Sequence, residues 1–396
     1  MTLKHIILGG ALAALAAMPA AAQTTVKIGV VLSLSGADSL PGQQVERGMQ
    51  LYMKQHQKDL PPGVKVDLLI RDDTGPNPDV AKRLTQELIA RDHVNMLAGA
   101  LYTPNAMAME PLVTEAKIPF IIENAATAVL TRRSPYVVRV SFTLWQTALP
   151  LGKWAAQQGA KKGYTAVSDY APGYDAEAAF AKGFAEGGGQ MVGSVRMPLG
   201  NVNYVPYLQR IEDAHPDVVY IFVPVSAAPA MMRAVGSLDF AGAHIKLVST
   251  MDLVPDQQLQ TMGDVVKGLV TSGTYSAAAD RPANKAFVAA WKHEYGADAW
   301  PDFTAVQGWD GMAAAYAVIE KTKGKFDIDQ AMAILKSWKN PDSPRGPIAI
   351  DPQTRDIVQN IYIRRVESVD GHLANVEFAT IPQVKDPWKE FNPEKK

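Results

Sequence analysis

The amino-acid sequence predicts an α/β fold made of two Rossmann-like, doubly wound parallel-sheet lobes joined by a three-segment hinge. Short runs rich in Val and Ile alternate with amphipathic stretches of helical period, the pattern of parallel strands connected by helices. The alternation restarts after residues 137–140, which predicts a second unit of the same kind. The chain has 396 residues, more than the ~250–300 that one hydrophobic core can serve.

The first lobe is expected to begin with a strand at residues 26–32, a nearly continuous β-branched run typical of a strand buried on both faces. The helix after it carries an apolar face made of Val45, Met49, Tyr52 and Met53. The series continues with strands at 65–70, 94–98 and 119–122 and with helices at 79–91 and 105–116. Right-handed crossovers should bring these strands into one parallel sheet.

The second series supplies the other lobe. Its expected strands are at 164–168, 191–197, 217–223, 245–249 and 268–272, and its helices at 149–158, 176–186, 205–214 and 228–238. Three consecutive glycines, 187–189, give helix 176–186 a strong C-terminal stop. Further helices at 284–295, 305–321 and 328–336 and late strands at 361–363 and 379–381 follow. We expect these late helices to return to the first lobe, because the second has no need of them.

This order predicts three crossings between the lobes, near Ser141, Tyr275 and Ile350. The first lobe then comprises residues 23–141 and 276–350, and the second comprises residues 142–275 and 351–396. Ligands of open α/β sheets bind beyond the carboxyl ends of the strands. Two such lobes facing each other should therefore form a single binding cleft.

Residues 1–22 are predicted to be a cleavable signal peptide. Lys4 precedes an apolar run, and the small residues Ala20-Ala21-Ala22 provide a cleavage site before Gln23. The run is shorter than the ~20 apolar residues of a transmembrane helix. We therefore expect an exported protein.

Composition excludes several classes of function. The 39 basic and 40 acidic side chains are balanced, so nucleic acid is not an expected partner. The chain has no Cys, which removes disulfides, thiol chemistry and cysteine-based zinc sites, and its seven His lack the spacing of a helical metal site. Phosphate-loop, nucleophile-elbow and dinucleotide-binding motifs are missing as well. We expect no catalytic residues, no metal and no cofactor, and Asp72-Asp73 in a turn.

Two neighbouring loops are candidates for holding a carboxylate. One follows the strand at 94–98 and leads into a helix near Thr103, whose hydroxyl and first backbone amides suit an anion. The alternative is an ordinary helix cap formed by Thr103 or Asn105. The loop after 119–122 repeats the arrangement with Ala126 and Thr127.

These loops belong to an ordered set of motifs that resembles the type I periplasmic solute-binding proteins of ABC importers, in the leucine/isoleucine/valine-binding branch. The motifs are Lys27-Ile28-Gly29-Val30, Leu34-Ser35-Gly36, the helix start with Gly42 and Arg47-Gly48, the stretch 99–111, Glu115-Ala116-Lys117-Ile118-Pro119, Ala126-Thr127, Asp169-Tyr170-Ala171-Pro172-Gly173, Pro216-Asp217 and Gln307-Gly308-Trp309-Asp310. The resemblance covers essentially all of the chain after residue 22. It implies a two-lobed clamp that closes over a small solute and presents it to a membrane permease.

The resemblance also implies the ligand-binding residues. It puts the ligand carboxylate against Thr103 and the backbone of Tyr102, with Ala126 and Thr127 completing this anchor. Amino-acid binders of this family usually carry an aromatic residue and an acidic residue in the second lobe. Those positions are similar to Pro172 and Met251 here, with Asp252 one residue further along. An α-ammonium group without a carboxylate partner would cost several kcal/mol in a buried site, which disfavours amino acids.

The C-terminal segments 303–310 and 343–347 resemble the branch that binds aromatic carboxylates such as hydroxybenzoates. Four side chains are expected to form an apolar wall for a ring, and these are Tyr102, Tyr170, Tyr174 and Met251. The alternative for each is packing between the lobes. Trp309 is expected in the core, and Arg345 is expected to fix the loop near a crossing.

The expected function is that of a periplasmic substrate-binding component of an ABC transporter, which captures an aromatic or other organic acid. A branched-chain amino acid is the alternative ligand. The same clamp also fits a periplasmic sensor that signals to a membrane receptor, and an enzyme is the third class. The expected partners are the small carboxylate, the inner-membrane permease and its ATPase subunits. We expect a monomer, because both lobes must stay free to dock and move.

Overall fold

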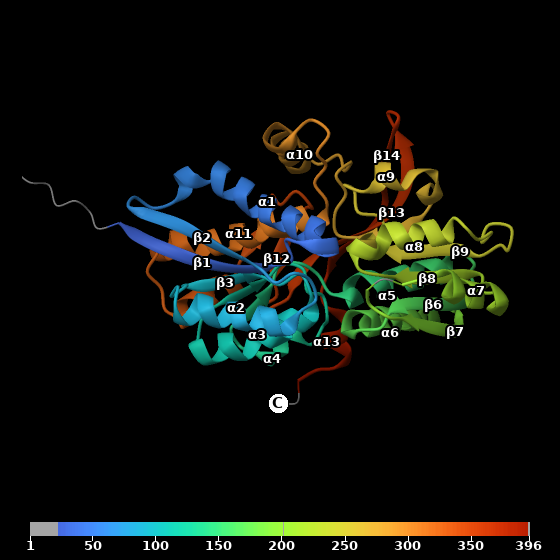
Figure 1. Ribbon diagram of the computed structural model, residues 1–396, viewed down its shortest axis with the longest axis horizontal. Helices are drawn as coiled ribbons and strands as arrows, with labels where there is room; N and C mark the ends of the chain where they lie inside the picture. The colour runs from blue at the N-terminus through green and yellow to red at the C-terminus, as the bar shows by residue number, and fades with distance from the viewer. Residues whose placement is uncertain (1–22, 201, 395–396) are drawn as a thin grey trace, which may run out of the picture.

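The computed structural model describes residues 23–200 and 202–394, so the predicted signal peptide lies outside the described residues. Two α/β lobes lie side by side, with β1 to β3 and α11 in one and β6 to β9 in the other (Figure 1). The C-terminal helix α13 (Pro387–Phe391) lies below the junction of the lobes. No helix in the described part of the chain combines the length and apolarity needed to cross a membrane.

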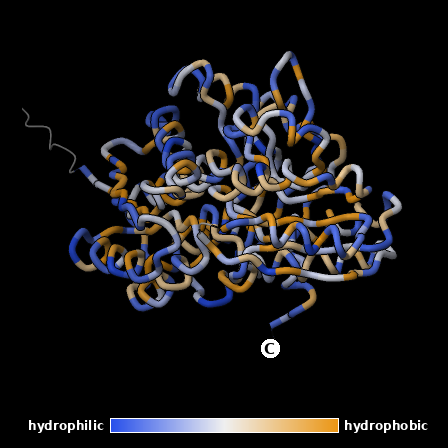
Figure 2. The backbone as a smooth tube through the Cα atoms, turned by 45° about the vertical axis from the view of Figure 1, so that its right-hand side comes forward, coloured by the Kyte–Doolittle hydropathy of each residue, from blue (hydrophilic) through white to orange (hydrophobic). Residues whose placement is uncertain are grey.

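The first lobe is built on a five-stranded parallel sheet in the order β2-β1-β3-β4-β5. Its strands are β1 (Thr24–Leu32), β2 (Val64–Asp72), β3 (Met96–Gly99), β4 (Phe120–Ile122) and β5 (Val137–Arg139). The last five residues of β1 are buried, as its apolar run predicts for a central strand covered on both faces. Figure 2 shows that hydrophobic segments run through the interior of the molecule.

Helices from both ends of the sequence belong to the first lobe. They are α1 (Ser39–Gln55), α2 (Pro78–Ala90), α3 (Thr103–Ala116), α4 (Leu130–Arg133), α10 (Pro282–Tyr295), α11 (Phe303–Thr322) and α12 (Ile328–Lys336), with short 3-10 turns η1 (Gly36–Asp38) and η2 (Gln57–Asp59). Most of them cover the sheet of this lobe, whereas α10 packs outside them against α1 and α11. α11 packs along α1 and shares a buried core with β1, so the predicted return of the late helices is confirmed. Trp309 of α11 lies in the core, also as predicted.

The second lobe contains five parallel strands in the order β10-β9-β8-β6-β7. The strands are β6 (Lys162–Ser168), β7 (Gln190–Met197), β8 (Val218–Phe222), β9 (Lys246–Thr250) and β10 (Val270–Gly273). The helices are α5 (Leu144–Gln157), α6 (Ala171–Glu186), α7 (Val205–Ala214), α8 (Ala228–Val235) and α9 (Leu259–Met262), with 3-10 turns η3 (Val225–Ala227), η4 (Met251–Leu253) and η5 (Gly263–Val266). Tyr220 packs with α5 and α6 while its neighbour Ile221 packs with α7 and α8, so the sheet is covered on both faces.

Antiparallel strands complete the second sheet and reach the first lobe. They are β11 (Lys339–Asn340), β12 (Ile348–Ile350), β13 (Ile357–Val369) and β14 (His372–Val384). Ile361 pairs with Ile381 and Ile363 with Ala379, which confirms the two late strands. Ile357 at the start of β13 packs in the first-lobe core, whereas Val366 packs in the second. One connection between the lobes is therefore a continuous strand, and the predicted lobe boundaries stay a prediction.

Arg345 ties the connecting segments together. Its side chain is 1% exposed, and its Nε donates to Asp310 of α11 at 2.8 Å. The Nη1 atom of Arg345 donates to the Ser141 carbonyl at 3.0 Å and to Oε1 of Gln359 at 2.9 Å. Ser141 follows β5 and Gln359 lies in β13, so one guanidinium group fixes two connections to the first lobe. The predicted role of Arg345 near a crossing is confirmed.

Close contact between α1 and α11 makes Gly48 a test of this packing. A Cβ atom at Gly48 would lie 2.0 Å from the Ala305 carbonyl oxygen, so Gly48→Ala must push the two helices apart. We expect the overpacking cost of about 1–3 kcal/mol to exceed the ~1 kcal/mol gained in helix propensity. Urea unfolding should show the loss.

The matched control is Gln50→Ala on the exposed side of the same helix. It should change the free energy of unfolding by no more than about 0.5 kcal/mol. A Gly48→Ala variant that is as stable as the control would contradict the close packing of α1 on α11.

Candidate ligand-binding site

A pocket lies between the lobes, at the carboxyl ends of both parallel sheets. Its cavity volume is only about 30 Å³, well below the roughly 300–1,000 Å³ that is usual for small-molecule sites, so the pocket has to widen when a ligand enters. Its lining residues are Pro41, Leu101, Tyr102, Thr103, Asn124, Ala126, Phe142, Leu144, Tyr170, Pro172, Phe222, Pro224, Val225 and Asp252. Six of the nine predicted site residues are in this set: Tyr102, Thr103, Ala126, Tyr170, Pro172 and Asp252.

The first-lobe side of the pocket is a pair of hydroxyl groups at the start of α3. Thr103 is the first residue of α3, and its Oγ1 lies 3.1 Å from Oγ1 of Thr127, so the structure brings the two predicted loops together. The alternative that Thr103 or Asn105 caps this helix is wrong, because the N-cap residue is Tyr102 and no side chain caps. Asn105 instead donates to Asp73 at 2.7 Å. The first amides of α3 and two hydroxyls are thus placed at one end of the pocket.

Tyr102 spans the cleft beside this hydroxyl pair. Its hydroxyl group donates to Asp38 of the first lobe and lies 3.4 Å from Oγ of Ser226 in the second. Burial, aided by the nearby Asp38 carboxylate, raises the pKa of the Tyr102 hydroxyl well above its usual value. Tyr102 therefore stays neutral and forms a polar contact between the lobes at the rim of the pocket.

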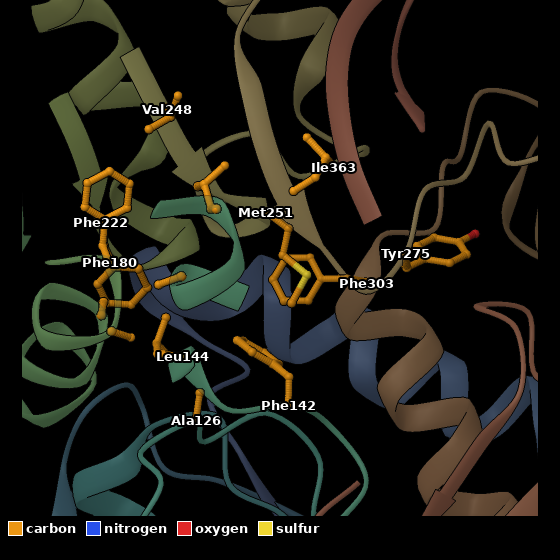
Figure 3. Packing of buried hydrophobic residues seen from close by; sticks show 14 of the residues in the cluster. Ala126, Phe142, Leu144, Phe180, Phe222, Val248, Met251, Tyr275, Phe303 and Ile363 are labelled. Atoms are coloured by element: carbon orange, nitrogen blue, oxygen red, sulfur yellow. The ribbon is translucent and has the colours of Figure 1, made fainter. Parts of the chain in front are cut away.

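Aromatic side chains from both lobes line the middle of the pocket. The rings of Tyr170 and Phe222 are stacked, with centroids 6.2 Å apart and planes 10° from parallel. Phe142, which follows β5, also lines the pocket, and its ring packs edge-on against Phe303. Figure 3 shows Phe142, Leu144 and Phe222 within one apolar cluster that continues toward Met251. The lining is therefore suited to a flat apolar group.

Asp252 is the acidic side chain of the pocket lining. It lies in η4, directly after β9, and is 7% exposed. Thr250 donates to its Oδ2 at 2.8 Å. Burial raises the pKa of Asp252 to about 6, against the lowering effect of the Thr250 hydrogen bond and the positive charge of Arg364. Asp252 is thus largely ionised at neutral pH.

Three predicted site residues are not among the lining side chains. Thr127 contacts the pocket through its bond to Thr103. Tyr174 is 41% exposed and donates to Asp169 at 2.8 Å, because it lies one helical turn beyond Tyr170 on the solvent side of α6. Met251 is fully buried, and its sulfur accepts from the Thr274 amide at 3.3 Å. The structure therefore does not place Tyr174 and Met251 in the expected aromatic wall.

Sequence reasoning missed eight of the lining residues, and four of these are Phe142, Leu144, Phe222 and Asn124. Phe142 and Leu144 follow β5, Phe222 ends β8 and Asn124 follows β4. All four positions lie at carboxyl ends of parallel strands, which is the rule that identified Thr103. The rule, applied to every strand, would have found them.

Other polar clusters have structural roles. Asp73 accepts from Ser33 at 2.6 Å and from Asn105, and Asp72 accepts from the amides of Leu34 and Thr74, so the turn interpretation of this pair is confirmed. Within residues 23–200 and 202–394, no three His, Asp or Glu side chains are arranged to hold a metal ion.

Two further contacts bridge the lobes. Gln44 of α1 donates to Gln257 of the second lobe at 2.7 Å, and Gln257 donates to Asp302 at the start of α11, also at 2.7 Å. On the other side, the Ala128 amide donates to Asp175 of α6 at 2.8 Å. Together with Tyr102, these bonds hold the lobes closed around the pocket.

Residues 25–372 match the family described as periplasmic binding protein. The chain belongs to this family. The family consists of substrate-binding proteins of transporters that work in the periplasm, and the predicted resemblance is confirmed. The fold and the two lobes of this periplasmic binding protein also agree with its solved relatives.

Relatives of this periplasmic binding protein carry two kinds of ligand name. "Leu/Ile/Val-binding protein homolog 6" from Brucella abortus (strain 2308) is 37% identical over 375 residues, which cover 94% of this chain and 95% of the relative. A solute-binding protein of an ABC transporter from Rhodopseudomonas palustris BisB5, solved with 3,4-dihydroxybenzoic acid, is 45% identical with a TM-score of 0.88, covering 92% of this chain and 99% of that chain. Another from R. palustris, solved with 4-hydroxybenzoate, is 41% identical with a TM-score of 0.88, covering 91% and 98%.

The Gln44–Gln257 bridge provides a test of lobe closure without a ligand. Gln257→Ala removes two hydrogen bonds between the lobes, each contributing about 0.5–1.5 kcal/mol, and should shift the ligand-free protein toward open forms. Small-angle X-ray scattering should show a larger radius of gyration. Gln260→Ala is the matched control, because Gln260 bonds to Leu373 within the second lobe. Equal radii for both variants would contradict this role of Gln257.

Proposed function

We propose that this periplasmic binding protein captures an aromatic carboxylate between its lobes and delivers it to the permease and ATPase subunits of an ABC importer. The observation that carries the proposal is the order of groups in the pocket. The hydroxyls of Thr103 and Thr127 stand at the start of α3, and the rings of Phe142, Tyr170 and Phe222 lie beside them. We also propose export by residues 1–22, action as a monomer and movement about the three predicted crossings.

The hydroxyl pair suits a carboxylate for electrostatic reasons. A helix N-terminus has a partial positive charge and amides without intrahelical partners, and two hydroxyls add donors. Thr103 is 1% and Thr127 is 5% exposed, so the ligand carboxylate would exchange bulk water for fixed donors. Charge-assisted hydrogen bonds of this kind are stronger than neutral ones. A small acid would therefore be held by its carboxylate in the first lobe.

The aromatic lining supports a ring rather than a branched aliphatic chain. Tyr170 and Phe222 are nearly parallel and Phe142 lines the same pocket, so closure would bury a flat ligand against several aromatic faces. The R. palustris relatives, solved with 3,4-dihydroxybenzoic acid and 4-hydroxybenzoate, support the same class.

A branched-chain amino acid is the second candidate. Asp252 offers a buried carboxylate to an α-ammonium group, and the Brucella relatives are named Leu/Ile/Val-binding protein homologs. The two candidates differ in the ammonium group, so binding measurements separate them.

Ligand binding is tested by thermal denaturation of the chain from Gln23 with benzoate, 4-hydroxybenzoate and 3,4-dihydroxybenzoate beside leucine, valine and phenylalanine. A ligand that binds only the folded protein stabilises it and so raises the melting temperature. The stabilisation is about 2.7 kcal/mol when the ligand concentration is a hundred times the Kd. We expect the aromatic acids to stabilise and the amino acids not to. Stabilisation by leucine or valine alone would assign the protein to the second candidate.

The carboxylate anchor is tested by Thr103→Ala. Losing a hydroxyl donor to a charged group should weaken binding of the stabilising acids by about 1–3 kcal/mol, measured by calorimetry. Thr114→Ala is the matched control, since Thr114 lies in the same helix and bonds to Glu110 and Ser134 away from the pocket. Unchanged affinity in Thr103→Ala would remove this residue from the site.

A further inference from the structure

Asp252 is a carboxylate inside a pocket that is proposed to receive another carboxylate. It is the one acidic side chain among the lining residues, and the lining contains no Lys, Arg or His. Two negative charges in one enclosed apolar pocket repel strongly, because little water screens them. A benzoate-like ligand therefore has to present a hydrogen-bond donor to Asp252, or the repulsion between the two carboxylates weakens its binding.

The surroundings of Asp252 leave it short of donors. Thr250 donates to one of its oxygens at 2.8 Å. An ionised carboxylate has about four lone-pair positions. Across the described residues no cation lies within ion-pairing distance of Asp252, and the guanidinium group of Arg364 is bonded to the Tyr275 carbonyl and, at 3.1 Å, to Thr271. Asp252 is therefore able to accept another hydrogen bond from a group inside the pocket.

The position of Asp252 in the fold decides which part of the ligand reaches it. Thr103 and Thr127 stand at the carboxyl ends of first-lobe strands, whereas Asp252 follows β9 of the second lobe. A ligand whose carboxylate binds in the first lobe and whose ring lies between Phe142 and Tyr170 presents its ring substituents to the second lobe.

We propose that Asp252 accepts a hydrogen bond from a hydroxyl group on the ring of the ligand, so that the pocket selects hydroxylated aromatic acids over the unsubstituted acid. This inference rests on the proposed function and names the substrate class of that same site. A neutral hydroxyl meets the carboxylate without adding charge, and it replaces a repulsive contact by a charge-assisted hydrogen bond. An analogue that lacks the hydroxyl leaves Asp252 with the Thr250 bond but without a donor from the ligand, and a pocket built to hydrogen-bond a substrate hydroxyl discriminates against such an analogue.

The test is calorimetric titration of the chain from Gln23 with benzoate, 3- and 4-hydroxybenzoate, and 3- and 4-methoxybenzoate. The methoxy acids keep the ring oxygen and remove the donor. We expect at least one hydroxybenzoate to bind roughly 10- to 100-fold more tightly than benzoate and than its methoxy counterpart, the range expected for a hydrogen bond to a charged group. Equal affinities for benzoate and both hydroxybenzoates would overturn the inference.

The variant Asp252→Asn keeps the shape of the side chain and removes its charge. It should bring benzoate and the hydroxybenzoates close to equal affinity. Asp256→Asn is the matched control, because Asp256 is a second buried carboxyl group nearby that bonds to Asn375 and is not in the pocket lining. This control should keep the wild-type ratio, and an unchanged ratio in Asp252→Asn would also overturn the inference. If Asp252→Asn fails to fold, the affinities of the wild-type protein for the hydroxy acids and for the methoxy acids still test the inference.

Low pH provides an independent readout. The groups that act on Asp252 are Arg364 from β13, Asp302 from the start of α11, Thr250 beside it, and the neutral hydroxyls of Tyr170 and Tyr220. Since the pKa of Asp252 is raised to about 6, protonation below that pH removes the charged acceptor. The preference for hydroxybenzoate over benzoate should fall between pH 7 and pH 5, and a constant preference would contradict the role of Asp252.

Failure of the inference is distinguishable from failure of the proposed function. Benzoate and hydroxybenzoates that bind equally well would refute only the role of Asp252. Binding of no aromatic acid would refute both. Binding of leucine or valine that is lost in Asp252→Asn would instead assign Asp252 to an ammonium group.

Discussion

The buried ion pair between Arg345 and Asp310 is the interaction on which the two-lobed arrangement depends. It fixes the segment after β5 and the strand β13 to helix α11, so both connections leave the first lobe at defined places. Removing one partner of such a pair costs about 3–5 kcal/mol, because the other charge is left buried and unpaired. The carboxyl ends of the two sheets face each other because these exit points are fixed, and the pocket exists only where they face each other.

The pocket and the interlobe core are one continuous apolar surface. Phe142 and Phe222 line the pocket and also belong to the cluster that contains Met251 and Phe303. Closing the lobes buries this surface whichever acid is bound, so much of the binding free energy does not depend on ligand identity. Discrimination is left to the few polar groups, namely the hydroxyls of Thr103 and Thr127 and the carboxylate of Asp252.

The sequence predicted the fold well because its signals are local. The β-branched run of β1 and the paired strands around Ile361 and Ile381 follow directly from residue types. The pairing of Thr103 with Thr127 followed from the rule on strand ends. The sequence could not decide whether Met251 or Asp252 faces the pocket, because both lie in a 3-10 turn, where successive side chains are rotated by about 120°. Which one faces the pocket depends on tertiary packing, and the same holds for Tyr174.

The path of β13 has a mechanical consequence. The strand is hydrogen-bonded to β12 beside the first lobe and to β10 and β14 in the second, so it has no slack of the kind a flexible linker provides. Any movement of one lobe relative to the other would have to twist β13 together with the strands paired to it, and the hydrogen bonds between these strands oppose that twisting. Main-chain hydrogen bonds do not depend on side-chain identity, so this restraint on the lobes should persist through most side-chain substitutions in the paired strands.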